Sequence, residues 1–165
     1  MTTPLLPTSA DCAKGSRHWR VSRDGDPVGL ALYGRHYSAR RYRDGRVRSL
    51  FVGPGEKLVL IGHDDRALFV WRKFISDDRQ VGICCSIFRN EGAVLSSVLV
   101  QEADELAWDR WPDELRHYTY VAPSLIRSTN PGYCFKIAGW QWFGSTTGGH
   151  GRPPLHILDR IRTKS

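Results

Sequence analysis

The sequence lacks any apolar run that approaches the roughly 20 residues of a membrane-spanning helix. Its first segment, residues 1–16, also lacks the charged start and the long apolar stretch of a signal peptide. We therefore expect a cytoplasmic protein that has no membrane partner. We expect residues 1–16 to form a flexible tail.

Cysteine is scarce, and its spacing predicts neither a disulfide framework nor a zinc site. The four cysteines, Cys12, Cys84, Cys85 and Cys134, include no C-x-x-C pair. Neighbouring Cys84 and Cys85 would point to opposite faces of a strand, which suits them poorly for binding one ion together. We expect the cysteines to be small core residues in a reducing compartment, and these spacings predict no metal site.

Repeats and low-complexity blocks are also absent, and the composition is that of a folded protein. The chain has 165 residues, of which 41% are hydrophobic, with six Trp, six Tyr and six Phe. A chain of this length and content can bury a sizeable core. We expect residues 17–165 to form a single domain.

Acidic residues are outnumbered, and the excess of positive charge gathers in one segment. The net charge is +7, and between residues 33 and 48 arginines alternate with aromatic side chains. Guanidinium groups pair with phosphates, and aromatic faces stack on exposed bases. The segment therefore predicts a nucleic-acid interface, and the alternative is a solvated basic loop that only aids solubility. The residues expected to contact nucleic acid are Arg35, Arg40, Arg41, Arg43 and Tyr42.

Hydrophobic periodicity predicts strand, helix, strand, strand, strand, helix, strand, helix and strand, in that order. The strands are expected at 18–22, 57–61, 67–71, 82–89, 117–121 and 155–158, and the helices at 26–35, 95–111 and 130–139. In the last helix we expect Asn130 to be the N-cap and Pro131 to occupy the first position. Gly139 is expected to end that helix in the left-handed conformation.

Two motifs follow one another in the second half of the chain. Arg89, Gly92 and Ala93 lie where the strand at 82–89 leads into a long helix, with Val94 next to them. The second motif runs from Asn130 to a Gly-Trp pair at 139–140. Together they resemble the GCN5-related N-acetyltransferases (GNAT). The resemblance implies an α/β, mixed α+β structure with the GNAT-like acyl-CoA N-acyltransferase fold, in which a mixed central sheet has splayed strands and helices on both faces.

The same resemblance implies a cofactor, acetyl-CoA or a related acyl-CoA. In the family, backbone N–H groups at the start of the long helix hold the pyrophosphate of coenzyme A. Here Val94 stands where the family has a second small residue. The residues expected to bind the cofactor are Ile87, Phe88, Arg89, Gly92, Ala93 and Asn130.

A closer resemblance joins four segments, 36–38, 88–92, 118–121 and 130–136. They are similar to the Mom-type DNA-modification proteins of bacteriophages, a GNAT-like family that modifies adenine in phage DNA and shields it from restriction. The resemblance implies a transferase that acts on DNA in a host cytoplasm and leaves the oligomeric state open. Two alternatives are a conventional acetyl-CoA-dependent N-acetyltransferase of a small amine or protein, and a non-catalytic nucleic-acid-binding protein.

Acyl transfer to an amine requires a base for the amine and a proton donor for the leaving thiolate. The resemblance points to Tyr133 as the proton donor, and a core aromatic is the alternative. His36 is the candidate base because its ordinary pKa lies near neutrality, with Tyr37 orienting the substrate or the base. Glu91 is a second candidate base. A metal-assisted route through His36 and Tyr37 stays open.

Overall fold

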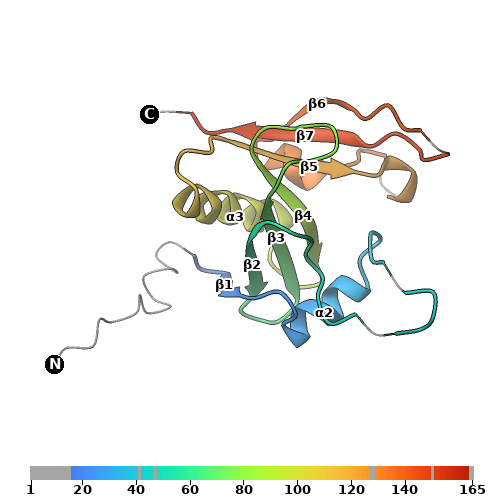
Figure 1. Ribbon diagram of the computed structural model, residues 1–165. Coiled ribbons are helices and arrows are strands. Elements are labelled where there is room, and N and C mark those ends of the chain that lie inside the picture. Colours follow the sequence, from blue (N-terminus) through green and yellow to red (C-terminus); the bar gives the residue numbers. More distant parts are fainter. Residues whose placement is uncertain (1–15, 41, 47, 127–128, 150, 164–165) are drawn as a thin grey trace.

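The computed structural model describes residues 16–163 except residues 41, 47, 127, 128 and 150. Nearly all of the predicted tail and Arg41 of the predicted nucleic-acid interface therefore lie outside the described residues. The strands form one sheet in the order β1-β2-β3-β4-β5-β7-β6. Figure 1 shows the half with β5, β7 and β6 turned steeply against the half with β2, β3 and β4, with α3 beside the junction.

The nine predicted elements all occur, and a mixed α+β fold is confirmed. None of the described helices is both long and apolar enough to cross a membrane. The elements are β1 (Trp19–Ser22), α2 (Pro27–Gly34), β2 (Glu56–Gly62), β3 (Ala67–Lys73), β4 (Ile83–Asn90), α3 (Ser96–Arg110), β5 (Arg116–Val121), a 3-10 turn (Pro123–Leu125), α4 (Tyr133–Ile137), β6 (Gln141–Ser145) and β7 (His156–Ile161).

The sheet buries apolar side chains on both faces, because alternate residues of a strand point to opposite sides. On β2, Leu58 and Leu60 pack into a cluster with residues of α3 and α4. Val59 and Ile61 pack into a second cluster with residues of α2. Helices therefore cover both faces, as expected.

Helix α2 begins as the sequence predicts and delivers a polar segment to the sheet. The Asp26 carboxylate accepts hydrogen bonds from the N–H groups of Val28 and Gly29, and Pro27 occupies the first turn. The C-cap is Arg35. The next residues, His36 and Tyr37, therefore leave the helix beside β4.

Strands β4 and β5 separate soon after they meet. Their parallel ladder has three residue pairs and ends at Cys85 and Thr119, although both strands continue. On its other edge β4 carries a bulge, because Val70 pairs with Ile87 while Trp71 pairs with Cys85, which leaves Ser86 without a partner on β3. The extra residue shifts the alternation of the later side chains by one position, so Cys85 packs on the α3 side and Ile87 on the α2 side.

Two predictions about the last third of the chain are wrong in detail. Helix α4 starts at Tyr133, and its N-cap is Gly132 rather than Asn130. Gly132 has φ +76°, and a Cβ there would lie 2.3 Å from a methyl group of Leu158, so the chain turns into the helix only at a glycine. Gly139 does end the helix region with φ +104°. The sequence-based order also omits β6.

Candidate active site

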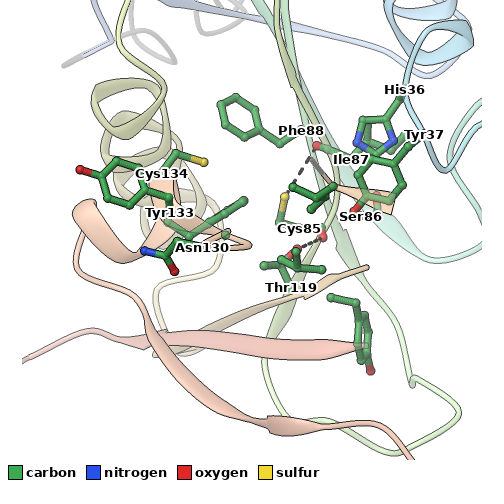
Figure 2. Close-up of a pocket in the computed structure, with 15 residues that line it drawn as sticks. His36, Tyr37, Cys85, Ser86, Ile87, Phe88, Thr119, Asn130, Tyr133 and Cys134 are labelled. Carbon is green, nitrogen blue, oxygen red and sulfur yellow. Dashed lines mark hydrogen bonds between the residues drawn. The ribbon is translucent and has the colours of Figure 1, made fainter. Parts of the chain in front are cut away.

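The divergence of β4 and β5 opens a cavity of about 360 Å³. Figure 2 shows His36 and Tyr37 on one side of it and Asn130, Tyr133 and Cys134 on the other. The lining residues are His36, Tyr37, Cys85, Ser86, Ile87, Phe88, Thr119, Tyr120, Val121, Ile126, Asn130, Gly132, Tyr133, Cys134 and Phe135. Six residues predicted from motifs far apart in the chain therefore share one cavity: His36, Tyr37, Ile87, Phe88, Asn130 and Tyr133.

Side chains of Thr119 and Cys85 lie where the ladder between β4 and β5 ends. The Thr119 hydroxyl donates to the Cys85 carbonyl oxygen at 2.9 Å, so the last paired carbonyl of β4 is satisfied. Burial raises the pKa of the Cys85 thiol well above its usual value, and it also raises the pKa of the Cys134 thiol. Both thiols stay protonated at neutral pH and are therefore weak nucleophiles.

The His36 ring is held by its own segment and by β4. The N–H group of Ser38 donates to Nδ1 at 3.1 Å, and the Ser38 hydroxyl lies 2.7 Å from the same atom. A hydrogen bond with the Phe88 backbone engages the ring from the side of β4. Burial, together with the positive charge of Arg89, lowers the pKa of His36 to about 4. The ring is therefore neutral at physiological pH and fastens this segment to β4.

Tyr37 stacks on His36, with ring centroids 4.4 Å apart and planes 29° apart. Its hydroxyl oxygen has a hydrogen bond with the Ala122 backbone, which links the segment after α2 to the end of β5. Burial raises the pKa of Tyr37, so the phenol keeps its proton at neutral pH. Tyr37 thus presents a protonated hydroxyl between the two diverging strands.

The opposite wall is formed by the start of α4. The Asn130 carboxamide oxygen accepts from Lys136 Nζ at 2.7 Å, and the Asn130 backbone carbonyl accepts from the N–H group of Tyr133 at 3.1 Å. Tyr133 is 57% exposed. Figure 2 shows its hydroxyl directed away from His36 and Tyr37. The two tyrosines therefore occupy opposite sides of the cavity.

Arg89 and Glu91 do not line the cavity but form an ion-pair network behind it. Arg35 Nε and Nη2 lie 2.7 and 2.9 Å from the Glu91 carboxylate, and Arg89 pairs with the same carboxylate. Arg89 Nη1 also donates to the Arg35 carbonyl oxygen at 2.7 Å. The hydrogen bonds from Arg35 and then Arg89 lower the pKa of Glu91 to about 2. The network anchors the end of α2 and with it His36 and Tyr37.

The loop before α3 offers free backbone donors. Among the described residues, the N–H groups of residues 93–97 have no hydrogen-bond acceptor, and α3 has no side-chain cap. The Val94 side chain is partly buried and packs against the core. A Cβ at Gly92 would lie 2.6 Å from Asp64 Oδ2, at the end of an exposed side chain that can move aside.

The remaining residues of the predicted nucleic-acid interface lie in the segment after Tyr37, apart from the paired Arg35. Arg40, Tyr42 and Arg43 are exposed. None of the three lines the cavity between β4 and β5. The basic segment therefore borders the candidate active site without entering it.

Residues that were not predicted as site residues also shape this cavity, although two of them, Thr119 and Cys134, lie within the motif segments 118–121 and 130–136. Ser86, Thr119 and Cys134 line it, and Ser86 supplies the bulge. Their contribution depends on strand register, which a single sequence does not specify. Neither the apolar run of β4 nor the Tyr-Thr-Tyr run of β5 carries a signal for the point at which the ladder stops.

A second polar group is buried on the far side of α3 from solvent. The Asp104 carboxylate accepts from His117 Nδ1 at 2.8 Å, Trp140 Nε1 at 3.0 Å and Arg160 Nη1 at 2.8 Å. Asp104 and His117 are fully buried, and His117 stacks on Trp108 with ring centroids 4.6 Å apart. The group lies outside the cavity and joins α3 to β5, β7 and the turn before β6.

Comparison with solved structures identifies the fold. No protein-family model and no curated protein matches the sequence. The aminoglycoside acetyltransferase AAC(6')-Ib in complex with coenzyme A is 17% identical, with a TM-score of 0.56 over 87% of this chain and 94% of that chain. A chimera of spermidine N-acetyltransferase SpeG from Vibrio cholerae and hSSAT has 10% identity and a TM-score of 0.56, with the same coverage. A GNAT-family acetyltransferase from Bacillus anthracis has 9% identity and a TM-score of 0.57 over 88% and 95% of the two chains. The chain therefore has the fold of the GNAT acetyltransferases.

Proposed function

We propose that this protein is an acyl-CoA-dependent N-acyltransferase. The observation that carries the proposal is the cavity at the point where β4 and β5 part, lined by both strands, by α4 and by the segment after α2. Such a cavity gives a thioester and an amine access to the same backbone groups from opposite sides of the sheet. Neighbours of the same fold that were crystallised with coenzyme A support this proposal.

The residues present fit an acyl-CoA. The unpaired N–H groups of residues 93–97 at the start of α3 suit a pyrophosphate, because the helix dipole and these donors both favour an anion. Gly92 and Ala93 are small and Val94 packs against the core, whereas Leu95 is exposed at the start of the helix. Asn130 and Tyr133 form one wall of the cavity. When bound, acetyl-CoA supplies a thioester carbonyl at the diverging strands.

Within the cavity we assign a role to each polar group. The backbone N–H group of Phe88, which points away from β3 and lies beyond the end of the ladder with β5, is the donor for the developing oxyanion. Tyr37 is the proton donor for the leaving thiolate, because it is a protonated phenol that lines the cavity beside the diverging strands. His36 orients Tyr37 by stacking, and Tyr133 contacts the acyl donor on the opposite wall.

The cavity favours an acceptor amine that is already neutral. Among the described residues no carboxylate lines it, and His36 has a pKa of about 4, so the site holds no strong base. Polyamines are cationic at neutral pH and need such a base. The exocyclic amine of a nucleobase is uncharged, although its lone pair is delocalised into the ring. The lack of a base, together with the adjacent basic segment, supports modification of a DNA base as the second candidate function, with adenine as the target that the Mom-type resemblance implies.

The first experiment is calorimetric titration of the purified protein with coenzyme A and acetyl-CoA. We expect saturable binding of both and, in a second step, loss of the thioester only when an acceptor is added. Spermidine, kanamycin and a single-stranded oligodeoxynucleotide are the acceptors to compare, with mass spectrometry of each product. Absence of coenzyme A binding would overturn the proposed function. Acetylated spermidine or kanamycin with unmodified oligonucleotide would assign the enzyme to small cationic amines and remove the second candidate.

A further inference from the structure

A second cavity, of about 390 Å³, lies between α2 and the basic segment after it. It is separate from the cavity between β4 and β5, called the acyl-transfer cavity below, and shares no lining residue with it. Its volume lies within the range of small-molecule binding sites. The lining residues are Leu30, Tyr33, Gly34, Ala39, Arg40, Tyr42, Gly45, Arg46 and Arg48.

The charges around this cavity are unbalanced. Three arginines line it, and in the described part of the chain the only carboxylate that pairs with one of them is Asp44, 2.6 Å from Arg46 Nε. The Nε–H group of Arg48 is buried and has no acceptor among the described residues. A buried donor without an acceptor is costly, and an anion in the cavity would satisfy it.

Tyr42 holds two of the guanidinium groups together. The guanidinium carbons of Arg46 and Arg48 lie 4.5 and 5.2 Å from the centroid of its ring. Cation–π attraction offsets part of the repulsion between these like charges. The ring is therefore engaged by arginines, and we assign Tyr42 to the support of the cationic wall instead of to base stacking.

The segment is fastened at both ends, so the cavity is a built feature of the fold. The backbone N–H group of Arg40 donates to the hydroxyl of the buried Tyr33 at 2.9 Å. At the other end, the Asp24 carboxylate accepts from the N–H groups of Phe51 and Val52 at 2.7 and 3.1 Å. These bonds fix both ends of the segment that carries the three arginines.

We propose that this cavity binds a phosphate ester of the acceptor, and that the acceptor is a nucleotide or a nucleotide unit of a strand. Arginine forks match the geometry of phosphate oxygens, and Arg40 and Arg48 both line this cavity. The apolar remainder, with Leu30 and Ala39, suits the organic part of such a ligand. The choice of acceptor rests on the proposed acyltransferase function, whereas the phosphate site does not.

The position of the cavity fits one acceptor that reaches both sites. Tyr37 lines the acyl-transfer cavity and Arg40 lines the phosphate cavity. Three residues of extended chain span at most about 11 Å. A nucleotide whose phosphate is bound near Arg40 therefore lies within a short distance of the group that donates the proton.

Binding of AMP and of a fluorescein-labelled ten-nucleotide single strand to the full chain tests the proposal. Arg48→Gln is expected to raise both dissociation constants about tenfold or more, because a charge-assisted hydrogen bond is lost. Arg43→Gln is the matched control: it removes the same charge from the same segment, outside the cavity. Arg43→Gln is expected to raise the two dissociation constants only about twofold, because it weakens the overall positive electrostatic field of the segment. Ala39→Phe fills the cavity without a change of charge and is expected to weaken AMP as Arg48→Gln does.

Equal losses for Arg43→Gln and Arg48→Gln would overturn the site in favour of a diffuse positive field. An unchanged affinity in Ala39→Phe would overturn it as well. If Arg48→Gln weakens coenzyme A and leaves AMP unchanged, the cavity holds a phosphate of the acyl donor and the proposal fails. Binding of the strand without AMP would assign the site to a polynucleotide, and binding of both would assign it to the single nucleotide. Coenzyme A titration of the same samples separates a failure of this site from a failure of the proposed function.

Discussion

Two tyrosines face the candidate active site from opposite walls, and their hydroxyls have different surroundings. Tyr37 is 44% exposed and reaches the Ala122 backbone between the diverging strands, whereas Tyr133 is 57% exposed with its hydroxyl directed outward. A single proton donor is expected to contribute about 100-fold or more to turnover. The difference between the two residues can therefore be measured.

We predict that Tyr37→Phe lowers kcat about 100-fold, because the ring still stacks on His36 but has no proton to give. Tyr133→Phe is the matched control, and we expect it to change KM for acetyl-CoA by about threefold with little change in kcat. Steady-state kinetics of both variants at several acetyl-CoA concentrations checks this. The reverse pattern would make Tyr133 the proton donor, as the family resemblance implies.

We predict that the His36 ring titrates with a midpoint near pH 4, because burial and Arg89 disfavour its charged form. Ring carbon shifts from NMR, assigned with His36→Gln, measure this midpoint. A value near 6.5 would show that the ring is free to act as a general base. The sign for stability follows from linkage: the unfolded ring takes up its proton near pH 6.5 and the folded ring only near 4. The stability that His36 contributes is thus complete above about pH 6.5 and is lost as the pH falls towards 4.

At the scale of elements, one carboxylate just beyond β4 pairs with an arginine at the end of α2 and with an arginine of β4. Glu91 is paired with Arg35 and Arg89, and its pKa falls from 4.5 to about 2. A carboxylate with a depressed pKa stabilises the fold above the unfolded pKa, and this contribution is lost as the pH falls through the folded pKa.

We predict that Glu91→Gln lowers the free energy of unfolding by about 1 kcal/mol at pH 7, since the pair is partly exposed. The difference from the wild type should shrink between pH 4.5 and about 2, as the wild-type carboxylate becomes protonated. Urea unfolding at several pH values measures it. Glu105→Gln, on the exposed side of α3, is the control and should have little effect. A difference that does not depend on pH would refute the ion-pair explanation.

The elements that the sequence predicts well are those with a buried face. Short apolar runs such as 57–61 and 67–71 are typical of buried strands, and they form β2 and β3. Strand β6 has no buried residue, contains Gly144 and lies at the edge of the sheet, so its pattern carries no burial signal. The sequence misplaces the start of α4 because Asn130 and Pro131 are as common in turns as at helix starts, and the contact of Gly132 with Leu158 decides between them.

Site residues could be predicted where the residue type itself indicates the chemistry. They could not be predicted where strand register decides which side chains reach the cavity. The motifs indicate His36, Tyr37, Asn130 and Tyr133, and these residues line one cavity. Arg89 and Glu91 belong to the same motifs, yet they pair with each other and with Arg35 behind the cavity. Opposite charges close in sequence signal a functional group and an ion pair equally well, and only the position of α2 distinguishes them.

For the whole molecule, Asp104 joins α3 to β5, to β7 and to the turn before β6. Its carboxylate, on α3, accepts hydrogen bonds from His117 of β5, Arg160 of β7 and Trp140 next to β6. Water does not reach this fully buried position, so it cannot take over the three hydrogen bonds if the carboxylate is lost. Its loss is therefore expected to weaken the entire domain and not one helix.

We predict that Asp104→Asn lowers the free energy of unfolding by about 3 kcal/mol in a single transition, because His117 and Arg160 lose their charged partner. Asp109→Asn is the same change on the same helix at an exposed position and should alter stability by less than about 0.5 kcal/mol. Chemical denaturation followed by tryptophan fluorescence compares the two. A loss confined to an early, separate transition would mean that Asp104 supports only α3.

The bulge at Ser86, which has no partner residue on β3, divides β4 into two parts that are under different structural constraints. Residues before it face the packing of α3 and tolerate little change, whereas residues after it border the two ligands of the proposed reaction. Because the bulge uncouples the two parts, substitutions beyond it can alter the choice of acceptor while the interior stays as it is. If Ser86 paired regularly with β3 and the bulge were lost, Ile87 and Phe88 would exchange sides of the sheet, and specificity and foldability would then no longer vary independently.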